Sequence, residues 1–271
     1  MGAADSIPGV SGGTIALITG IYTQLIEAIN NIQFKFLKPL LKRDYSGFLS
    51  QLSEEIEFEF FIPLILGIGV GFLTLAKIIT YCLDIHTALT YSLFLGLIIA
   101  SAAVLFKKLN KINVKEFLFV LLGFILTYIF VSLNPISTNH SLLIIFFSGL
   151  IAICAMILPG ISGSFILVLL GQYKYMLTAL HEFHLSEIII FIIGALIGIL
   201  SFSKIINFFL KNYEEITMSF LIGVMIGSLK VPSMEIIKSI NLNLTNISSY
   251  IIISIIGFAL ILILETKFNK N

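Results

Sequence analysis

A short Pro-Gly-x-Ser-Gly motif occurs twice in this chain, each time in front of an apolar run. The first copy, PGVSGGT, lies within residues 4–14, and the second, PGISGSF, lies within residues 155–165. Proline removes a backbone donor and glycine accepts positive φ, so each motif predicts a break in a helix. The helix that restarts at about Ser11 or Ser162 would present unpaired N–H groups and a partial positive charge. With the serine hydroxyls added, this pattern is typical of an anion site.

The candidate binding residues are the polar, glycine and proline positions of the two motifs, together with two lysines inside apolar runs. They are Asp5, Ser6, Pro8, Gly9, Ser11, Gly12, Gly13, Thr14, Pro159, Gly160, Ser162, Gly163, Ser164, Lys77 and Lys204. Ionisable residues within a membrane segment are functional candidates, and these lysines would balance the charge of an anion. The alternative for each lysine is that its ammonium group reaches the lipid head groups.

Other kinds of site are less well supported. Asp5 has no acidic counterpart, because Met156 occupies the equivalent position of the second motif. Asp5 therefore indicates either a helix cap or coupling to protons or sodium. His181, Glu182 and His184 do not complete a metal-binding set and fall in an expected loop. We expect no catalytic residue, no metal and no cofactor.

The composition indicates an all-α integral membrane protein. Of the 271 residues, 58% are hydrophobic and 11% are charged, and many apolar runs approach the length that crosses a bilayer. The runs are continuous rather than alternating, which favours helices over a barrel. We therefore expect a multi-pass membrane protein. The formal net charge of +1 says nothing about partners, and we expect no nucleic acid.

The motif belongs to a longer internal repeat. An offset of 151 positions aligns the two motifs, and an offset of 127 aligns later segments in the same order. The pairs matched at these two offsets are Pro8 with Pro159, Ser11 with Ser162, Tyr22 with Tyr173, Gly67 with Gly194, Gly71 with Gly198, Lys77 with Lys204, Thr90 with Thr217, and Gly96 with Gly223. A last pair, Gly123 with Gly257, follows in the same order at an offset of 134. The Gly67/Gly71 and Gly194/Gly198 spacings predict close helix packing.

Each half is expected to hold one motif segment and three membrane helices within a single membrane domain. The first repeat covers 1–135, with a hairpin tip at 5–14, a cytoplasmic loop at 30–60 and helices at about 61–82, 87–106 and 116–133. The second repeat covers 141–271, with a hairpin at about 142–180 and helices at about 187–208, 216–231 and 248–266.

The segment 142–180 is too long for one crossing, and its Pro-Gly break divides it into two short arms. This pattern predicts a re-entrant hairpin that returns to its starting side. The first motif has no such arm ahead of it, and we expect the native start to lie upstream of Met1.

A hairpin plus three crossings is an odd number of passes, so the second repeat is expected to be inverted relative to the first. Placing 30–60 in the cytoplasm puts eleven basic residues inside and three outside, as the positive-inside rule requires. The inside residues are Lys35, Lys38, Lys42, Arg43, Lys107, Lys108, Lys111, Lys115, Lys211, Lys267 and Lys270, and the outside ones are Lys174, Lys230 and Lys238. The region 33–60 is either a basic segment on the surface of membrane lipids or a solvated loop.

The stretches MGAADSIPGVSGGTIALITGIY and ILPGISGSFILVLLGQY resemble the polyprenyl-phosphate transporters, a bacterial and archaeal family. The resemblance covers nearly the whole chain. It implies a flippase that returns undecaprenyl phosphate from the outer to the inner leaflet, where the carrier is recycled for cell-envelope synthesis. The motif residues would bind the phosphate, while the prenyl tail stays in lipid through a lateral opening. The sequence leaves the coupling ion and a homodimer open.

Two other functions are compatible with the same motifs. One is transport of small inorganic anions or organic acids. The other is an undecaprenyl-diphosphate phosphatase, whose Pro-Gly-x-Ser-Arg-Ser motif is similar. Gly12 and Gly163 stand where that motif has arginine, and the apolar runs hold no paired glutamates. Phosphoryl chemistry needs such a cation and a general base, so the transporter is preferred over an enzyme.

Overall fold

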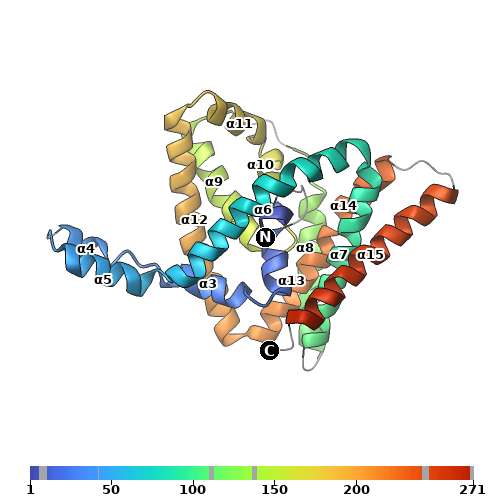
Figure 1. The fold of residues 1–271 in the computed structure, drawn as a ribbon, viewed down its shortest axis with the longest axis horizontal. Coiled ribbons are helices and arrows are strands. Elements are labelled where there is room, and N and C mark those ends of the chain that lie inside the picture. The colour runs from blue at the N-terminus through green and yellow to red at the C-terminus, as the bar shows by residue number, and fades with distance from the viewer. Residues whose placement is uncertain (6–10, 42, 110–112, 136–138, 240–243, 269–271) are drawn as a thin grey trace.

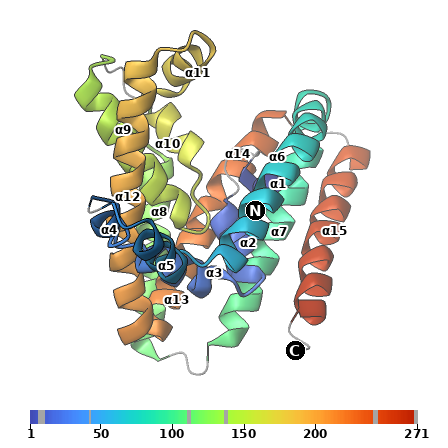
Figure 2. The ribbon, with the colours of Figure 1, turned by 60° about the vertical axis from the view of Figure 1, so that its left-hand side comes forward.

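The chain folds into a bundle of helices. The computed structural model describes residues 1–5, 11–41, 43–109, 113–135, 139–239 and 244–268, and these ranges contain no β-strand. Figure 1 labels the helices from α3 onward, and Figure 2 also labels α1 and α2. In order they are α1 (Gly2–Asp5), α2 (Gly12–Ile18), α3 (Tyr22–Asn31), α4 (Leu37–Leu41), α5 (Tyr45–Glu55), α6 (Phe58–Ile85), α7 (Thr87–Lys108), α8 (Val114–Val131), α9 (Leu142–Ile157), α10 (Gly163–Leu169), α11 (Tyr173–His181), α12 (Leu185–Asn212), α13 (Glu214–Ser228), α14 (Lys230–Ser239) and α15 (Leu244–Phe268).

Six spans in the described residues are long and apolar enough to cross a membrane, which makes the chain a multi-pass membrane protein. They are α6, α7, α8, α12, α15 and the α13–α14 pair. Two bent pairs, α2 with α3 and α10 with α11, would raise the number to eight if each were one span. Each of these six spans overlaps one of the helical segments expected from the sequence. The bounds differ most after Ser228, where α14 continues beyond the predicted end at 231.

The region 30–60 contains two short helices, α4 and α5, which the sequence analysis did not separate from the surrounding loop. Both project from one side of the bundle (Figure 1). Asp44 caps α5, because its carboxylate accepts a hydrogen bond of 3.0 Å from the N–H of Gly47. Such a cap satisfies one of the unpaired donors at a helix start. These helices lie away from the motif segments.

Helices of the first half pack on helices of the second half. α7 lies along α15, and α8 lies along α13 (Figure 2). Each contact is a close backbone approach at glycine. A Cβ added at Gly96 would lie 1.9 Å from the carbonyl oxygen of Ser254, and one at Gly223 would lie 2.0 Å from that of Val120. Because Gly96 and Gly223 are matched by the repeat, the two helix pairs use equivalent glycines.

The second motif lies between α9 and α10, and α10 runs back along α9. A Cβ added at Gly163 would lie 3.0 Å from the carbonyl oxygen of Ala152, in the middle of α9. At the other end of the hairpin, the Gln172 amide donates to the carbonyl of Asn139 at 3.1 Å, and the ring Nδ1 of His140 lies 2.9 Å from Oε1 of Gln172. Gln172 therefore lies beside Asn139 and His140, which precede α9 in the sequence.

The glycine spacings in α6 and α12 have different outcomes. A Cβ at Gly194 would lie 2.1 Å from the carbonyl of Phe146, and one at Gly198 would lie 2.6 Å from that of Leu150, so α12 packs closely on α9 as predicted. The same prediction is wrong for Gly67, where an added Cβ would meet no described neighbour within 4 Å. Here α6 packs against α1, which has only four residues, and the close contact is between Gly2 and the backbone of Ile68. A helix this short leaves Gly67 uncovered.

Candidate functional site

The two motif segments meet in the interior of the bundle. The hydroxyl of Ser11 donates to the carbonyl of Leu158 at 3.2 Å, and the N–H of Gly160 donates to the hydroxyl of Thr14 at 2.9 Å. Ser11 and Thr14 are 1% and 3% exposed, and Pro159 is also buried. Two hydrogen bonds thus join residues that are about 150 positions apart in the sequence, inside an apolar bundle.

Each motif serine caps the helix that follows the break. Ser11 has extended backbone angles and accepts a hydrogen bond of 3.1 Å from the N–H of Gly13. Ser162 has the same conformation and accepts one of 3.2 Å from the N–H of Phe165. Serine at this position satisfies a donor that the first turn leaves unpaired. The predicted restarts at Ser11 and Ser162 are therefore confirmed.

Glycine is required at two positions where the motifs touch their surroundings. Gly160 has φ of +88°, a conformation that other residues rarely adopt, and a Cβ there would lie 3.0 Å from the Cα of Met225. A Cβ at Gly13 would lie 2.8 Å from the carbonyl oxygen of Ile157, at the end of α9. A larger residue at either position would push the two motifs or their neighbours apart.

The two motifs are not used in the same way. The Ser11 hydroxyl accepts from Gly13 of its own motif and donates to Leu158 of the other motif segment. The Ser162 hydroxyl, which accepts from Phe165, lies 3.1 Å from that of Ser164, and both groups belong to the second motif. The N–H groups of Gly163 and Ser164 make no hydrogen bond to another described residue. Two hydroxyls and two amide donors are therefore gathered at the second motif, where they can accommodate the oxygens of an anion.

The remaining predicted residues are placed apart from this contact or are not described. Lys77 and Lys204 lie at the same position along the 28-residue helices α6 and α12, and both are exposed. Neither makes a hydrogen bond or ion pair with a residue in the described ranges, and the structure does not bring them to the motifs. Asp5 ends α1. Ser6, Pro8 and Gly9 lie outside the described residues, and Gly12 begins α2 in a buried position.

Two buried polar groups near the motifs were missed by the sequence analysis. The Tyr22 hydroxyl at the start of α3 and the Asn207 amide oxygen in α12 are buried without a hydrogen-bond partner among the described residues. Tyr22 is 1% exposed and belongs to the same apolar cluster as Ile157 and Met225, which adjoin the motifs. The only signal in the sequence was the match of Tyr22 with Tyr173. An unpaired buried polar group is costly, so each of these two needs an explanation.

One ion pair joins α12 to α3, the helix that follows the first motif segment. Lys211 forms an ion pair of 3.2 Å with Glu27, which links α12 to α3 where both side chains are largely exposed. Within the described ranges, no three His, Cys, Asp or Glu side chains are grouped as metal ligands would be. The site is therefore built from hydroxyl, amide and backbone groups.

Known proteins resemble this chain over most of its length. A family model described as undecaprenyl phosphate translocase-like matches residues 1–246. A polyprenyl-phosphate transporter of Vibrio cholerae serotype O1 is 42% identical, over 84% of this chain and 73% of the relative. A polyprenyl-phosphate transporter of Staphylococcus aureus is 32% identical, over 84% of this chain and 81% of the relative. No solved structure matches the chain.

Proposed function

Because the chain belongs to the undecaprenyl phosphate translocase-like family, we propose that it returns undecaprenyl phosphate from the outer to the inner leaflet of the bacterial plasma membrane. Two relatives are named polyprenyl-phosphate transporters, and the family is one of transporters rather than enzymes. The proposed cargo is a lipid with one phosphate head group, and the proposed role is to recycle this carrier for cell-envelope synthesis.

The main observation that supports the proposal is the contact between the two motifs. The hydrogen bonds from Ser11 to Leu158 and from Gly160 to Thr14 connect the described parts of the two motifs within the bundle. Beside them, the hydroxyls of Ser162 and Ser164 lie 3.1 Å apart at the start of α10. A phosphate is an acceptor of several hydrogen bonds, and hydrogen bonds from neutral donors to a charged group are stronger than those to a neutral one.

An inverted repeat would make this contact reachable from either side of the membrane. Two observations support that arrangement. The helix pairs α7–α15 and α8–α13 use glycines that the repeat makes equivalent, and Gln172, which follows α10, lies beside Asn139, which precedes α9. Transporters with inverted repeats place the substrate at the repeat interface near the midplane, and access alternates by movement of one repeat against the other.

The second motif also supports transport over phosphatase chemistry. Gly163 stands where the similar phosphatase motif has arginine, and Ser164 follows it. No carboxylate accepts or donates a hydrogen bond at Ser11, Thr14, Ser162 or Ser164 within the described residues. Phosphoryl transfer relies on a cation and a general base in contact with the phosphate. We expect the lipid to leave the protein chemically unchanged.

The experiment that tests the proposal is reconstitution in liposomes with a labelled polyprenyl phosphate. We expect the protein to increase the rate at which the label moves between leaflets, and pH and sodium gradients would identify the coupling ion. Equal stimulation by a water-soluble phosphate or an organic acid, with no movement of the lipid, would assign the chain to small-anion transport. Release of inorganic phosphate from undecaprenyl diphosphate would assign it to the phosphatases.

A further inference from the structure

An apolar crevice of about 610 Å³ lies between α8, α12 and α13. This volume is within the range of about 300–1,000 Å³ that is typical of small-ligand sites. No charged side chain of the described residues lines it. The lining residues are Phe119, Leu122, Leu158, Phe202, Ile205, Ile206, Phe209, Tyr213, Ile216, Thr217, Phe220 and Leu221.

The crevice opens sideways, toward the surface that lipid covers. Its floor is buried, with Ile206 at 7% and Leu221 at 0% exposure. Its rim is exposed, with Ile205 at 50%, Phe209 at 44% and Leu122 at 45%. Thr217, one of the two polar side chains in the wall, donates its hydroxyl to the carbonyl of Tyr213 at 2.8 Å. The wall therefore offers hydrocarbon contact and little that a phosphate would bind.

One end of the crevice reaches the second motif. Leu158 lines the crevice, and its carbonyl accepts the hydrogen bond from Ser11. Pro159 and Gly160 follow directly in the sequence. The opposite end lies at the α12–α13 corner, where Tyr213 is close in sequence to the charged residues Lys211 and Glu214. Tyrosine and charged residues are typical of the membrane surface, so the crevice extends from the motifs toward one face of the bilayer.

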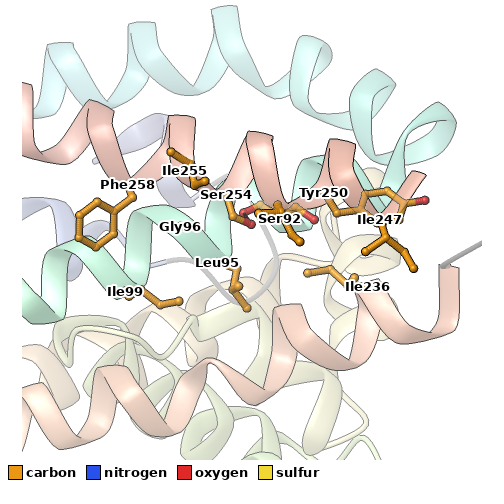
Figure 3. Close-up of a pocket in the computed structure, with 11 residues that line it drawn as sticks. Ser92, Leu95, Gly96, Ile99, Ile236, Ile247, Tyr250, Ser254, Ile255 and Phe258 are labelled. Atoms are coloured by element: carbon orange, nitrogen blue, oxygen red, sulfur yellow. Dashed lines mark hydrogen bonds between the residues drawn. The ribbon is translucent and has the colours of Figure 1, made fainter. Parts of the chain in front are cut away.

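At equivalent positions of the first half, α6 and α7 are in direct contact. There, the hydroxyl of Thr90 donates both to the carbonyl of His86 at 2.9 Å and to that of Cys82 on α6 at 3.0 Å. Phe94 and Ile79, which the repeat matches with Leu221 and Ile206, pack with Ala4 in one apolar cluster. A different cavity, of about 480 Å³ between α7, α14 and α15, is lined by residues outside both motifs (Figure 3). The α8–α12–α13 crevice is thus distinguished by its connection to the motifs.

We propose that this crevice holds the isoprenoid tail of the polyprenyl phosphate while the head group lies at the motifs. The assignment rests on the proposed function, because it takes the head group of the same lipid as its starting point. An isoprenoid chain has no hydrogen-bonding groups, so an uncharged wall of aliphatic and aromatic side chains matches its chemistry. The continuity at Leu158 places the tail and the head group in one connected site.

The chain contains no tryptophan, which permits a direct test. Ile205→Trp places a single fluorophore at the rim of the crevice, and Leu122→Trp places one on the facing helix α8. Ile197→Trp is the matched control, because Ile197 lies on α12, is 47% exposed and does not line the crevice. Each variant is reconstituted in phospholipid with brominated acyl chains, which quench tryptophan on contact, and is then titrated with an unbrominated long-chain polyprenyl phosphate.

The expected result is a saturable recovery of fluorescence for the Ile205→Trp and Leu122→Trp variants and a small linear change for the Ile197→Trp control. The same mole fraction of unbrominated phospholipid should give only the small linear change. Equal recovery with phospholipid, or no saturable recovery in either crevice variant, would overturn the tail assignment. Transport by the wild-type protein is measured in parallel. If the wild-type protein transports the lipid but neither crevice variant recovers fluorescence, the crevice assignment is wrong and the proposed function stands. If the wild-type protein does not transport the lipid, the proposed function is wrong.

Discussion

The N–H of Gly160 donates a hydrogen bond of 2.9 Å to the hydroxyl of Thr14, across 146 positions of the sequence. Both groups are buried, and Gly160 adopts positive φ to present its N–H in this direction. The donor freed by the second Pro-Gly break is therefore satisfied by the first motif. This contact joins the two motifs, so a substitution at Thr14 should alter the environment of Gly160.

Thr14→Val tests this dependence, because valine has nearly the shape of threonine but no hydroxyl. The Gly160 N–H would then be buried without a partner, at a cost of about 1–3 kcal/mol. We expect a lower thermal unfolding midpoint in detergent and slower lipid transport. Thr14→Ser keeps the acceptor and serves as the control. An unchanged midpoint in Thr14→Val would show that the hydrogen bond does not hold the motifs together.

Gly13→Ala should separate the motifs by steric overlap. Its Cβ would lie 2.8 Å from the carbonyl oxygen of Ile157, which belongs to the backbone and cannot turn aside. Overpacking of this kind costs about 1–3 kcal/mol. Gly69→Ala is the matched control, because an added Cβ there would meet no described neighbour within 4 Å. The thermal midpoints of the two variants, measured under the same conditions, should differ clearly; similar values would contradict the close contact.

Ser162 and Ser164 are expected to act on binding more than on folding. A hydrogen bond to a charged group contributes about 1.5–3 kcal/mol, and about 1.4 kcal/mol corresponds to a tenfold change in Kd. Ser164→Ala should therefore weaken polyprenyl-phosphate binding by roughly tenfold or more. Ser162→Ala should also loosen the cap of α10. Ser11→Ala is the comparison, since its hydroxyl is engaged within the protein and its loss should mainly lower stability.

Tyr22→Phe distinguishes a binding role from a structural one. The Tyr22 hydroxyl is buried and has no partner among the described residues, so removing it should leave the free energy of unfolding unchanged or raise it. If the hydroxyl contacts the lipid phosphate during transport, the same variant should transport more slowly. We expect this combination of retained stability and reduced transport. Full transport by Tyr22→Phe would exclude the hydroxyl from the site.

Lys77→Gln and Lys204→Gln should affect binding less than Ser164→Ala. Both lysines are exposed, and neither contacts a motif residue in the described structure. Their position favours an ammonium group that reaches the lipid head groups over one that neutralises a bound anion. Binding measured at several salt concentrations is the test. A tenfold loss of affinity for the lipid, with a weaker salt dependence of binding, would show that the lysines do belong to the binding site.

The sequence predicted the long helices and the helix restarts at Ser11 and Ser162, because hydrophobic runs and Pro-Gly breaks are local signals. The different use of the two motifs could not be predicted in the same way. Gly13 and Ser164 are matched by the repeat, yet the first must be small to meet Ile157, while the second has room for a hydroxyl. Such differences depend on which helices become neighbours. The unpaired state of Tyr22 and Asn207 depends on the same packing.

The glycine contacts also determine how the protein can be divided. α7 is covered by α15 and α13 is covered by α8, so each half supplies a surface that the other half needs. A cut between α8 and α9 would leave two fragments, each with a backbone groove at Gly96 or Gly223 and no helix to fill it. The halves are therefore interlocked rather than modular, and we expect the fragments to become functional only when they are produced together and reassemble.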